Sequence, residues 1–337
     1  MTNLEWAEKP IEGDYLETNE GLLFAVKGLE HPKSLVIAYL RYIPDSKGNR
    51  VRDGRHYSRV YRISETTDYL LDNYPKYLNN VDSMGLVLQS VPLGNIYRLY
   101  KPREYLQRII KSQGTPLEEA CIQFVNEISN RSNVDLKHFG VSGSPLIGLD
   151  TPSSDIDLNV YGEAEGKEVH KILDSMRAEL DWISPYNSKT VNSVLGSRWR
   201  ETRLNLNYFK EIEIKKQLHG RVSGRDYFIR LIKPIESDEL SRPLGFVKIR
   251  GVIEEAESLF TPCSYQFRLI EYIEPAFGPE ITKLVSFRGR FTEQAQIGSV
   301  VEVYGSIEKV TSKGFHYYRV ILGSPRDYLL PVNILDR

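Results

Sequence analysis

Cysteine is scarce in this chain of 337 residues, in which only Cys121 and Cys263 occur, far apart. Two such residues have no metal-ligand spacing and form no disulfide framework, and their scarcity indicates a reducing compartment. Cys121 lies on the apolar face of an expected helix and is interpreted as a core thiol. The sequence also lacks a signal peptide and any apolar run long enough to span a membrane. We therefore expect a cytoplasmic protein.

Net charge is nearly absent as well. The 44 basic and 45 acidic residues give a formal charge of −1, so the whole chain has no electrostatic footprint for nucleic acid and such binding would need a local patch. With 41% hydrophobic residues, 24 glycines and 17 prolines, the composition is that of an ordinary globular protein with ample core. A chain of this length predicts two or three domains.

The first hundred residues predict a β-rich domain. A short helix is expected over Glu65–Asp72, with Ser64 as its cap. The expected strands are Gly21–Val26, Ser34–Tyr42, Tyr57–Ile63, Gly85–Val91 and Asn95–Tyr100. The loop Asp45–Gly54 and the strand after it are rich in arginine and tyrosine. These side chains could contact a polynucleotide by charge and stacking, or the tyrosines could serve only the strand.

Helical patterns follow. The expected helices are Glu104–Lys111, the segment from Pro116 to Ile128, and Lys167–Trp182. Thr115 is a suitable N-cap for the second of these helices, and Pro116 follows it at the first helical position, where proline is favoured. Its apolar stripe should pack under a sheet. His170 lies beside the stripe of the third helix and is interpreted as a boundary residue and not as a ligand.

The segment Ser188–His219 is expected to be mostly helical. Arg200 and Arg203 would share one helical face there. They could hold a triphosphate or an acceptor phosphate, or they could form a solvated charged face with Glu201. Tyr186, in the connection before this segment, is a candidate for stacking on a base.

The most informative stretch runs from Phe139 to Gly162 and reads FGVSGSPLIGLDTPSSDIDLNVYG. An apolar run ends at Gly143-Ser144, and Ser144 is a favoured N-cap for a short helix that has Pro145 at its first position. The free backbone amides at the start of such a helix form a site for phosphate oxygens. The sequence therefore predicts a phosphate cradle at this turn.

A pair of carboxylates follows the cradle. Asp155 and Asp157 lie two residues apart on an alternating polar and apolar strand, so they face the same way. Two adjacent carboxylates repel unless a cation lies between them, and Mg²⁺ or Mn²⁺ fits this role. A phosphate cradle and a metal-binding pair suit nucleotide transfer from a triphosphate. The alternative is an ordinary polar turn before a strand with two surface acids.

These residues resemble the DNA polymerase β-like nucleotidyltransferase superfamily, whose signature is an apolar strand, Gly-Ser, a helical turn and an Asp-x-Asp strand. Within the superfamily, the chain is most similar to an archaeal group of predicted nucleotidyltransferases, on the motifs Gly-Ser-x-Leu-x-Gly, Ser-Asp-Ile-Asp-Leu and Val-Tyr-Gly. The superfamily motif covers the middle of the chain, and the similarity to the archaeal group extends over most of it. The resemblance implies that Gly143, Ser144 and Ser154 bind the nucleotide, and that Asp155 and Asp157 bind metal and are catalytic.

The superfamily also places a third carboxylate on a neighbouring strand, where it helps hold the metal at the attacking hydroxyl and accepts the hydroxyl proton. The corresponding strand, Gly224–Ile232, has Phe228 at its centre, and Asp226 lies on the same face at its very start. Glu213 is a second candidate, in helical surroundings. We predict that Asp226 is the third carboxylate. Without a well-placed third acid, triphosphate binding could survive while transfer would be slow or absent.

The C-terminal part again predicts strands, after the polar linker Pro234–Pro243. The expected strands are Phe246–Ile253, Tyr265–Ile273, Lys283–Phe287, Val300–Val310 and Phe315–Leu322. Their number and spacing suggest a small closed barrel, OB-like. Such barrels often bind single strands through exposed aromatic and basic side chains. The candidates here are His316, Tyr317, Tyr318, Arg319, Arg288 and Arg290; a purely structural barrel is the alternative.

The sequence as a whole predicts an α+β protein. Residues 1–100 form a β-rich N-terminal domain, residues 101–236 a polymerase-β-like nucleotidyltransferase core with a mixed sheet and flanking helices, and residues 243–337 the C-terminal β-barrel. The predicted activity is Mg²⁺-dependent transfer of a nucleoside monophosphate from an NTP to an acceptor hydroxyl, with release of pyrophosphate and RNA as the favoured acceptor. A second hypothesis is a non-catalytic module that binds nucleotide, RNA or a protein partner. A third, a protein-modifying transferase of a toxin–antitoxin pair, fits poorly with the large flanking domains.

Overall fold

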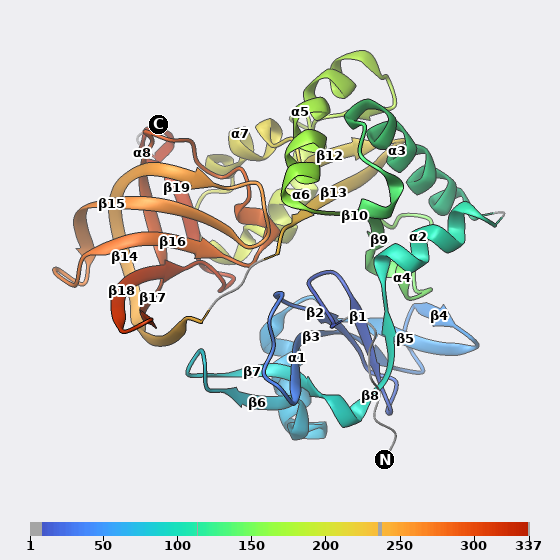
Figure 1. Ribbon diagram of the computed structural model, residues 1–337, viewed down its shortest axis with the longest axis horizontal. Helices are drawn as coiled ribbons and strands as arrows, with labels where there is room; N and C mark the ends of the chain where they lie inside the picture. The colour runs from blue at the N-terminus through green and yellow to red at the C-terminus, as the bar shows by residue number, and fades with distance from the viewer. Residues whose placement is uncertain (1–8, 113, 235–237, 336–337) are drawn as a thin grey trace. The chain divides into compact units, whose positions relative to one another are not determined.

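The computed structural model describes residues 9–112, 114–234 and 238–335 and is an α+β structure with three sheets (Figure 1). The chain forms two compact units. The first unit consists of the described residues up to Val81, Val87–Glu118 and Gly140–Ser154; the second consists of Asp82–Leu86, Glu119–Phe139 and the described residues from Asp155 onward.

The first unit is built on a curled antiparallel half-barrel. Its strands follow the order β4-β5-β3-β2-β1-β8, and β7 pairs with both β3 and β6. The strands are β1 (Tyr15–Thr18), β2 (Leu23–Val26), β3 (Leu35–Pro44), β4 (Arg50–Arg52), β5 (Arg55–Arg59), β6 (Leu78–Val81), β7 (Leu86–Pro92) and β8 (Ile96–Tyr100). The expected β-rich character of the first hundred residues is confirmed.

Helix α1 (Ile63–Asn73) covers the core of this half-barrel, into which it buries Leu70 beside Tyr77. The helix begins before the expected cap, because Arg62 is its N-cap residue and makes no side-chain capping bond. Ser64 therefore lies inside the first turn, where it cannot cap the helix, and that prediction is wrong.

Two helices follow the half-barrel, as their apolar stripes predict: α2 (Pro102–Ile110) and α3 (Pro116–Ser132). Thr115 and Glu118 form a capping box, in which the Thr115 hydroxyl accepts from the Glu118 amide at 3.3 Å and the Glu118 carboxylate accepts from the Thr115 amide at 2.8 Å. Further along α3, the Phe124 ring lies 5.0 Å from the ring of Tyr227 in the central sheet. The expected packing of this helix on the sheet is confirmed. None of the described helices is long and apolar enough to cross a membrane.

The central sheet is mixed and has the strand order β11-β12-β13-β10-β9. Its strands are β9 (Phe139–Ser142), β10 (Ile156–Tyr161), β11 (Ile183–Ser184), β12 (His219–Val222) and β13 (Arg225–Ile232). Strand β10 runs parallel to β13, whereas β12 is antiparallel to both β11 and β13. Helix α5 (Glu163–Glu179) packs on this sheet through its buried Val169, Leu173 and Met176.

The segment between β11 and β12 is more broken than the sequence predicts. It contains α6 (Val191–Arg198), a 3₁₀ turn η4 (Arg200–Thr202) and α7 (Asn207–Lys215). Arg203 ends the 3₁₀ turn with a left-handed backbone (φ 62°), and Asn205 in the following link has low helix propensity. Arg200 and Arg203 therefore do not share a helical face, and that expectation is wrong.

The C-terminal segment forms a mixed sheet that closes into a ring. Its strands follow the order β14-β15-β16-β18-β17-β19; pairing of β14 with β17 closes the ring, and β16 and β18 are parallel. The strands are β14 (Leu240–Glu257), β15 (Cys263–Glu274), β16 (Ile281–Ser286), β17 (Val300–Ser312), β18 (Phe315–Ile321) and β19 (Tyr328–Pro331), followed by the short helix α8 (Val332–Leu335). Lys313 and Gly314, both with positive φ, make the tight turn between β17 and β18.

Strand β14 begins earlier than the sequence predicts. Leu240 to Pro243, assigned to the Pro234–Pro243 linker, pair with β17 as the first residues of an 18-residue strand. Pro243 has no amide hydrogen to donate, and the pairing shows an irregularity between it and Gly245. The linker prediction is wrong for these residues, and residues 235–237 of the same segment lie outside the described part of the chain.

A buried ionic cluster joins the helices of the second unit to its C-terminal ring. The carboxylate of Glu213 accepts hydrogen bonds from Arg198 at 2.8 Å, from the indole of Trp199 at 3.0 Å and from Lys216 at 3.0 Å. Lys216 also donates to the carbonyl oxygen of Arg290, in the 3₁₀ turn η5 (Gly289–Phe291). Burial alone would raise the pKa of Glu213, but the Lys216 and Arg198 charges hold it below its ordinary value.

We expect Glu213→Gln to destabilise the protein by about 3 kcal/mol or more, because it leaves the fully buried Lys216 without its counter-charge. Glu211→Gln, on the exposed side of the same helix, is the matched control and should change the stability by less than about 0.5 kcal/mol. Urea unfolding of both variants followed by circular dichroism measures the difference. Equal midpoints for the two variants would contradict the proposed importance of the cluster.

Candidate active site

Strand β10 positions the two carboxylates that the sequence singled out. Ile156 and Leu158 are fully buried, whereas Asp155 and Asp157 are only partly buried. Because side chains alternate along a strand, the two aspartates face the same side, with Asp155 directly before the first residue of the strand. The alternation that the sequence predicted is confirmed.

The parallel neighbour β13 brings Asp226 to the same end of this sheet. Ile156 pairs with Tyr227 and Asp157 with Phe228, so Asp226 is level with Asp155 and one strand away. Burial raises the pKa of Asp226, and the negative charge of Asp155 raises it further, while Arg221 and Arg198 act in the opposite direction. The register therefore places Asp226 within electrostatic reach of the Asp155 carboxylate.

Arginine side chains balance this acidic end of the sheet. Arg221 of β12 is opposite Asp226, and its guanidinium donates to the Asp226 carboxylate at 3.1 Å. On the same face of the sheet, Arg230 donates to the side-chain oxygen of the buried Asn159 at 3.2 Å, with its guanidinium 5.0 Å from the centre of the Phe228 ring. The acids thus lie among fixed positive charges, as a site for an anionic ligand requires.

Phe228 occupies the centre of β13, where no carboxylate is present. Its ring stacks on the imidazole of His219 at 4.7 Å, and burial lowers the pKa of His219 well below its ordinary value, so this imidazole is neutral. A Cβ on Gly289 would lie 2.3 Å from the Phe228 ring, so the C-terminal ring approaches β13 closely at this point. The open acidic positions are therefore those at Asp155, Asp157 and Asp226, toward the start of both strands.

The carboxylates of Asp155 and Asp157 suit a metal ion that binds together with a phosphorylated substrate. Within the described residues, no group of three or more histidine, cysteine, aspartate or glutamate side chains is arranged to hold a metal ion. Asp155 and Asp157 offer oxygen ligands only, and Mg²⁺ is commonly held by one or two carboxylates together with water and substrate phosphates. This donor set fits Mg²⁺ or Mn²⁺ completed by a phosphorylated substrate better than a preformed protein cage.

The Gly-Ser turn lies in the first unit, within the segment Gly140–Ser154 that precedes Asp155 in the chain. Gly143 has φ 76°, a conformation that glycine adopts without strain, and the one-turn helix α4 (Gly143–Leu146) begins there. The Ser144 hydroxyl donates to that of Ser154 at 3.1 Å, and the Ser154 hydroxyl also accepts from the Thr151 amide at 2.9 Å. The helix starts before Ser144, so Ser144 is not its N-cap and Pro145 not its first residue, and those expectations are wrong.

Several residues proposed from the sequence are engaged elsewhere. Tyr186 is buried in the core of the second unit and cannot stack on a base. Glu213 belongs to the buried ionic cluster, which makes it unsuitable as the third carboxylate. Arg200 and Arg203 are both exposed. Arg198, a residue that the sequence reasoning did not assign, lies close enough to Asp226 to affect its pKa; no sequence signal distinguished it from its arginine neighbours.

The basic and aromatic residues proposed for the C-terminal ring are mostly bound within the protein. Arg290 is buried and donates to the carbonyl oxygens of Ser324 and Asp327 at 2.8 and 3.1 Å. Arg319 binds Glu308 and Glu239, which also accepts from the Tyr317 hydroxyl. These contacts favour the structural interpretation for those side chains.

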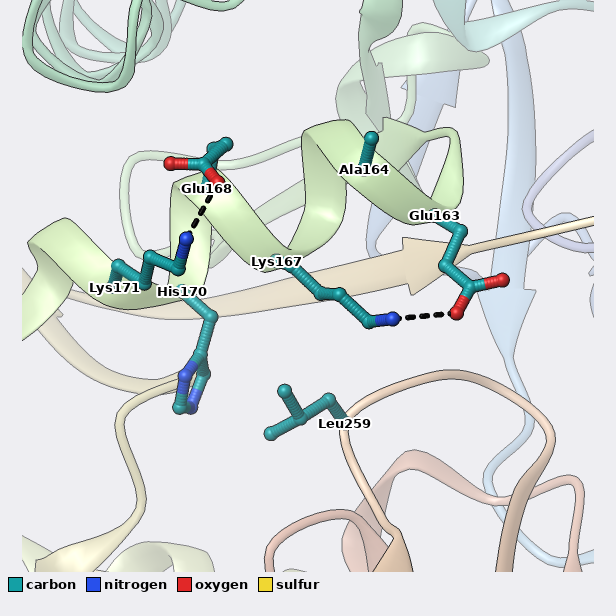
Figure 2. Close-up of a pocket in the computed structure, with 7 residues that line it drawn as sticks. All are labelled: Glu163, Ala164, Lys167, Glu168, His170, Lys171 and Leu259. Atoms are coloured by element: carbon teal, nitrogen blue, oxygen red, sulfur yellow. Dashed lines mark hydrogen bonds and ion pairs between the residues drawn. The ribbon is translucent and has the colours of Figure 1, made fainter.

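A separate hollow of about 710 Å³ lies along α5, where Leu259 faces the helix (Figure 2). Its charged side chains pair with each other, Lys167 with Glu163 and Lys171 with Glu168, both at 2.6 Å. None of the three aspartates of the candidate site lines it. Because its charges are already balanced and no carboxylate pair or arginine converges there, we do not assign it a catalytic role.

A comparison with known proteins gives a relative over nearly the whole chain. No family model matches the sequence. The chain is 28% identical over 334 residues to the uncharacterized protein MJ1086 of Methanocaldococcus jannaschii, an alignment that covers 93% of this chain and 95% of that protein. The similarity is to an archaeal protein whose name states no activity.

Proposed function

We propose that this protein is a Mg²⁺- or Mn²⁺-dependent nucleotidyltransferase that moves a nucleoside monophosphate from an NTP to an acceptor hydroxyl and releases pyrophosphate. One observation carries the proposal: Asp155 and Asp157 share one face of β10, and Asp226 lies level with Asp155 on the parallel neighbour β13. Three carboxylates at one end of a sheet, among arginines, suit phosphoryl chemistry on a polyanionic substrate.

In the proposed reaction Asp155 and Asp157 would hold the metal ion. Once bound, the ion would neutralise negative charge on the phosphates. Asp226 accepts the proton of the acceptor hydroxyl, a role that its raised pKa favours over that of an ordinary exposed aspartate. The acceptor oxygen forms a bond to the α-phosphorus, the bond to the β-phosphate oxygen breaks, and pyrophosphate leaves. Arg221, ion-paired to Asp226, keeps that carboxylate oriented.

The triphosphate contacts in this proposal come from the sequence motif. Gly143, Ser144 and Ser154 carry the resemblance to the polymerase β-like superfamily, and the positive φ of Gly143 supports a backbone that approaches a ligand closely. Arg200 and Arg203 remain proposed phosphate contacts, supported by their exposure and charge alone.

The family assignment is part of the same proposal. The extent of the similarity to an archaeal protein is in keeping with a resemblance to the archaeal group of predicted nucleotidyltransferases. The C-terminal ring, in which β14-β15-β16-β18-β17 close on β14 with a parallel β16–β18 pair, supports an OB-like barrel. RNA is the favoured acceptor in this proposal because barrels of this kind often bind single strands, although Arg290, Arg319 and Tyr317 are engaged within the protein.

A second candidate function is a non-catalytic module that retains nucleotide binding. It is favoured by the Arg221–Asp226 ion pair, which engages the third carboxylate, and by Phe228 at the centre of β13. The two functions differ in one measurable respect, which is whether the wild-type chain transfers the nucleotide that it binds; if it does, the rate should depend on Asp226.

We expect Asp155→Asn and Asp157→Asn to abolish Mg²⁺-dependent binding or transfer, since each removes a charged metal ligand. The assay incubates the full chain with each labelled NTP, Mg²⁺ and total RNA. Asp72→Asn, an exposed substitution on α1, is the control and should retain wild-type activity. Full metal-dependent activity in the double Asp155→Asn, Asp157→Asn variant would refute the metal assignment.

Asp226→Asn should slow transfer by roughly 100-fold or more, as loss of a general base does, while the Kd for a non-hydrolysable NTP changes by less than about threefold. Single-turnover rates and calorimetry measure the two quantities separately. If the rate is unaffected, Asp226 is not the base; if the wild-type chain binds nucleotide but transfers nothing, the binding-module function is correct.

Ser144→Ala should weaken nucleotide binding by about 1 kcal/mol or more, the scale of a lost hydrogen bond to a charged group. Gly143→Val should be more harmful, because valine strains at the positive φ of this position and adds bulk where a phosphate would lie. Calorimetry with a non-hydrolysable triphosphate tests both. Unchanged affinity in Ser144→Ala would remove the hydroxyl from the proposed phosphate contacts.

A further inference from the structure

The loop from Gly143 to Leu149, which contains the Gly-Ser turn, is closed by its own backbone bonds. The amide of Gly148 donates to the carbonyl oxygen of Pro145 at 3.1 Å, and the amide of Leu149 donates to that of Ser144 at 3.0 Å. These bonds fix the shape of the loop. They do not fix its position, which depends on what the loop contacts.

The start of the loop is tied to the N-terminal half-barrel. The buried hydroxyl of Ser142 donates to the carbonyl oxygen of Gly13 at 2.6 Å. Two residues earlier, a Cβ on Gly140 would lie 2.7 Å from the side chain of Pro102 and 2.8 Å from its backbone. The strand that leads into the loop therefore runs in close backbone contact with the rest of the first unit.

The end of the loop is held by two arginines of β4. Arg50 donates to the carbonyl oxygen of Leu149 at 3.0 Å, and Arg52 donates to that of Ile147 at 3.4 Å. A Cβ on Gly148 would lie 3.5 Å from the aliphatic carbons of Arg52, so the arginine stem lies along the loop backbone. The same strand therefore contacts three consecutive residues of the loop.

Arg52 is itself rigidly anchored. Its guanidinium binds Glu17 at 2.6 Å and the Tyr100 hydroxyl at 3.1 Å, and that hydroxyl donates to the second Glu17 oxygen. The side chains of Arg52 and Glu17 are only 15% and 9% exposed. A planar guanidinium can make these bonds together with the one to Ile147, which a lysine ammonium on a flexible stem cannot reproduce. The anchor thus links strands β1, β4 and β8 to the loop.

We propose that the N-terminal half-barrel holds this loop in its nucleotide-binding conformation, with Arg52 as the positioning residue. The proposal rests on the proposed function, and it gives the half-barrel a role in triphosphate binding through the Gly-Ser loop of the same unit. Arg52 acts through the loop backbone, since its bonds go to a loop carbonyl, to Glu17 and to tyrosine hydroxyls. Loss of the Arg52 side chain should therefore lower the affinity for a triphosphate, because the loop from Gly143 to Leu149 would become less ordered.

The test uses the full chain and compares Arg52→Lys, Tyr100→Phe and the control Arg59→Lys. Arg59 lies on the neighbouring strand β5, where its guanidinium contacts the rings of Tyr42 and Tyr61. Three quantities are measured below the unfolding range: the Kd for a non-hydrolysable NTP with Mg²⁺, hydrogen exchange of the Gly148 and Leu149 amides, and the thermal midpoint.

Arg52→Lys should raise the Kd by about tenfold and speed amide exchange at Gly148 and Leu149. Tyr100→Phe, which removes only the hydroxyl, should have a smaller effect in the same direction, and Arg59→Lys should stay within about twofold of wild type. A wild-type Kd in Arg52→Lys would overturn the positioning role, whether or not the thermal midpoint falls. The proposed function would not be affected by that result, because Asp155→Asn tests it separately. If the wild-type chain binds no NTP, the proposed function fails and this role fails with it.

Discussion

The candidate site depends on the main-chain register between two parallel strands, β10 and β13. Side chains alternate with a period of two, so a slip of one residue would turn Asp226 to the opposite face of the sheet. The opposite face of β13 fixes this register. Tyr227 is buried there against the Phe124 ring, and its hydroxyl binds the Arg177 guanidinium and the carbonyl oxygen of Gln217. The position of Asp226 thus follows from core packing on the opposite face of the sheet and does not depend on contacts within the candidate site.

The buried cluster around Glu213 is the second constraint on the part of the second unit that carries the candidate site. Burying an ion pair yields little net stability, because the loss of hydration offsets the attraction. Its effect here is on geometry: the cluster connects α6 and α7 to the turn η5 of the C-terminal ring. The next residue pair along this connection is Gly289 against Phe228, which closes the ring over the centre of β13. The position of the ring and the shape of the acidic end of the sheet are therefore linked.

Charge balance is the feature that the two proposed functions, nucleotidyl transfer and nucleotide binding alone, have in common. The carboxylates of Asp155 and Asp226 repel each other, and the positive charge of the Arg221 guanidinium offsets that repulsion. A cation bound by Asp155 and Asp157 would have the same effect on the pair. The arginines suit a polyanionic ligand in either function, so nucleotide binding alone does not distinguish them. Only the proton-accepting role of Asp226 does.

The sequence by itself determined the local features of this protein. The alternation at Asp155 and Asp157, the capping box at Thr115, most of the strands and the ring-forming spacing of the C-terminal segment follow from periodicity and turn chemistry, which act over a few residues. The positions of Asp226 and Glu213 were decided only by tertiary structure, because strand register and burial depend on residues far apart in the chain. The same holds for the clamp of Arg52 on the Gly-Ser loop, whose partners are separated by about a hundred residues. Pairing between distant segments leaves no periodic trace in the sequence, since each contact is set by packing of the whole core.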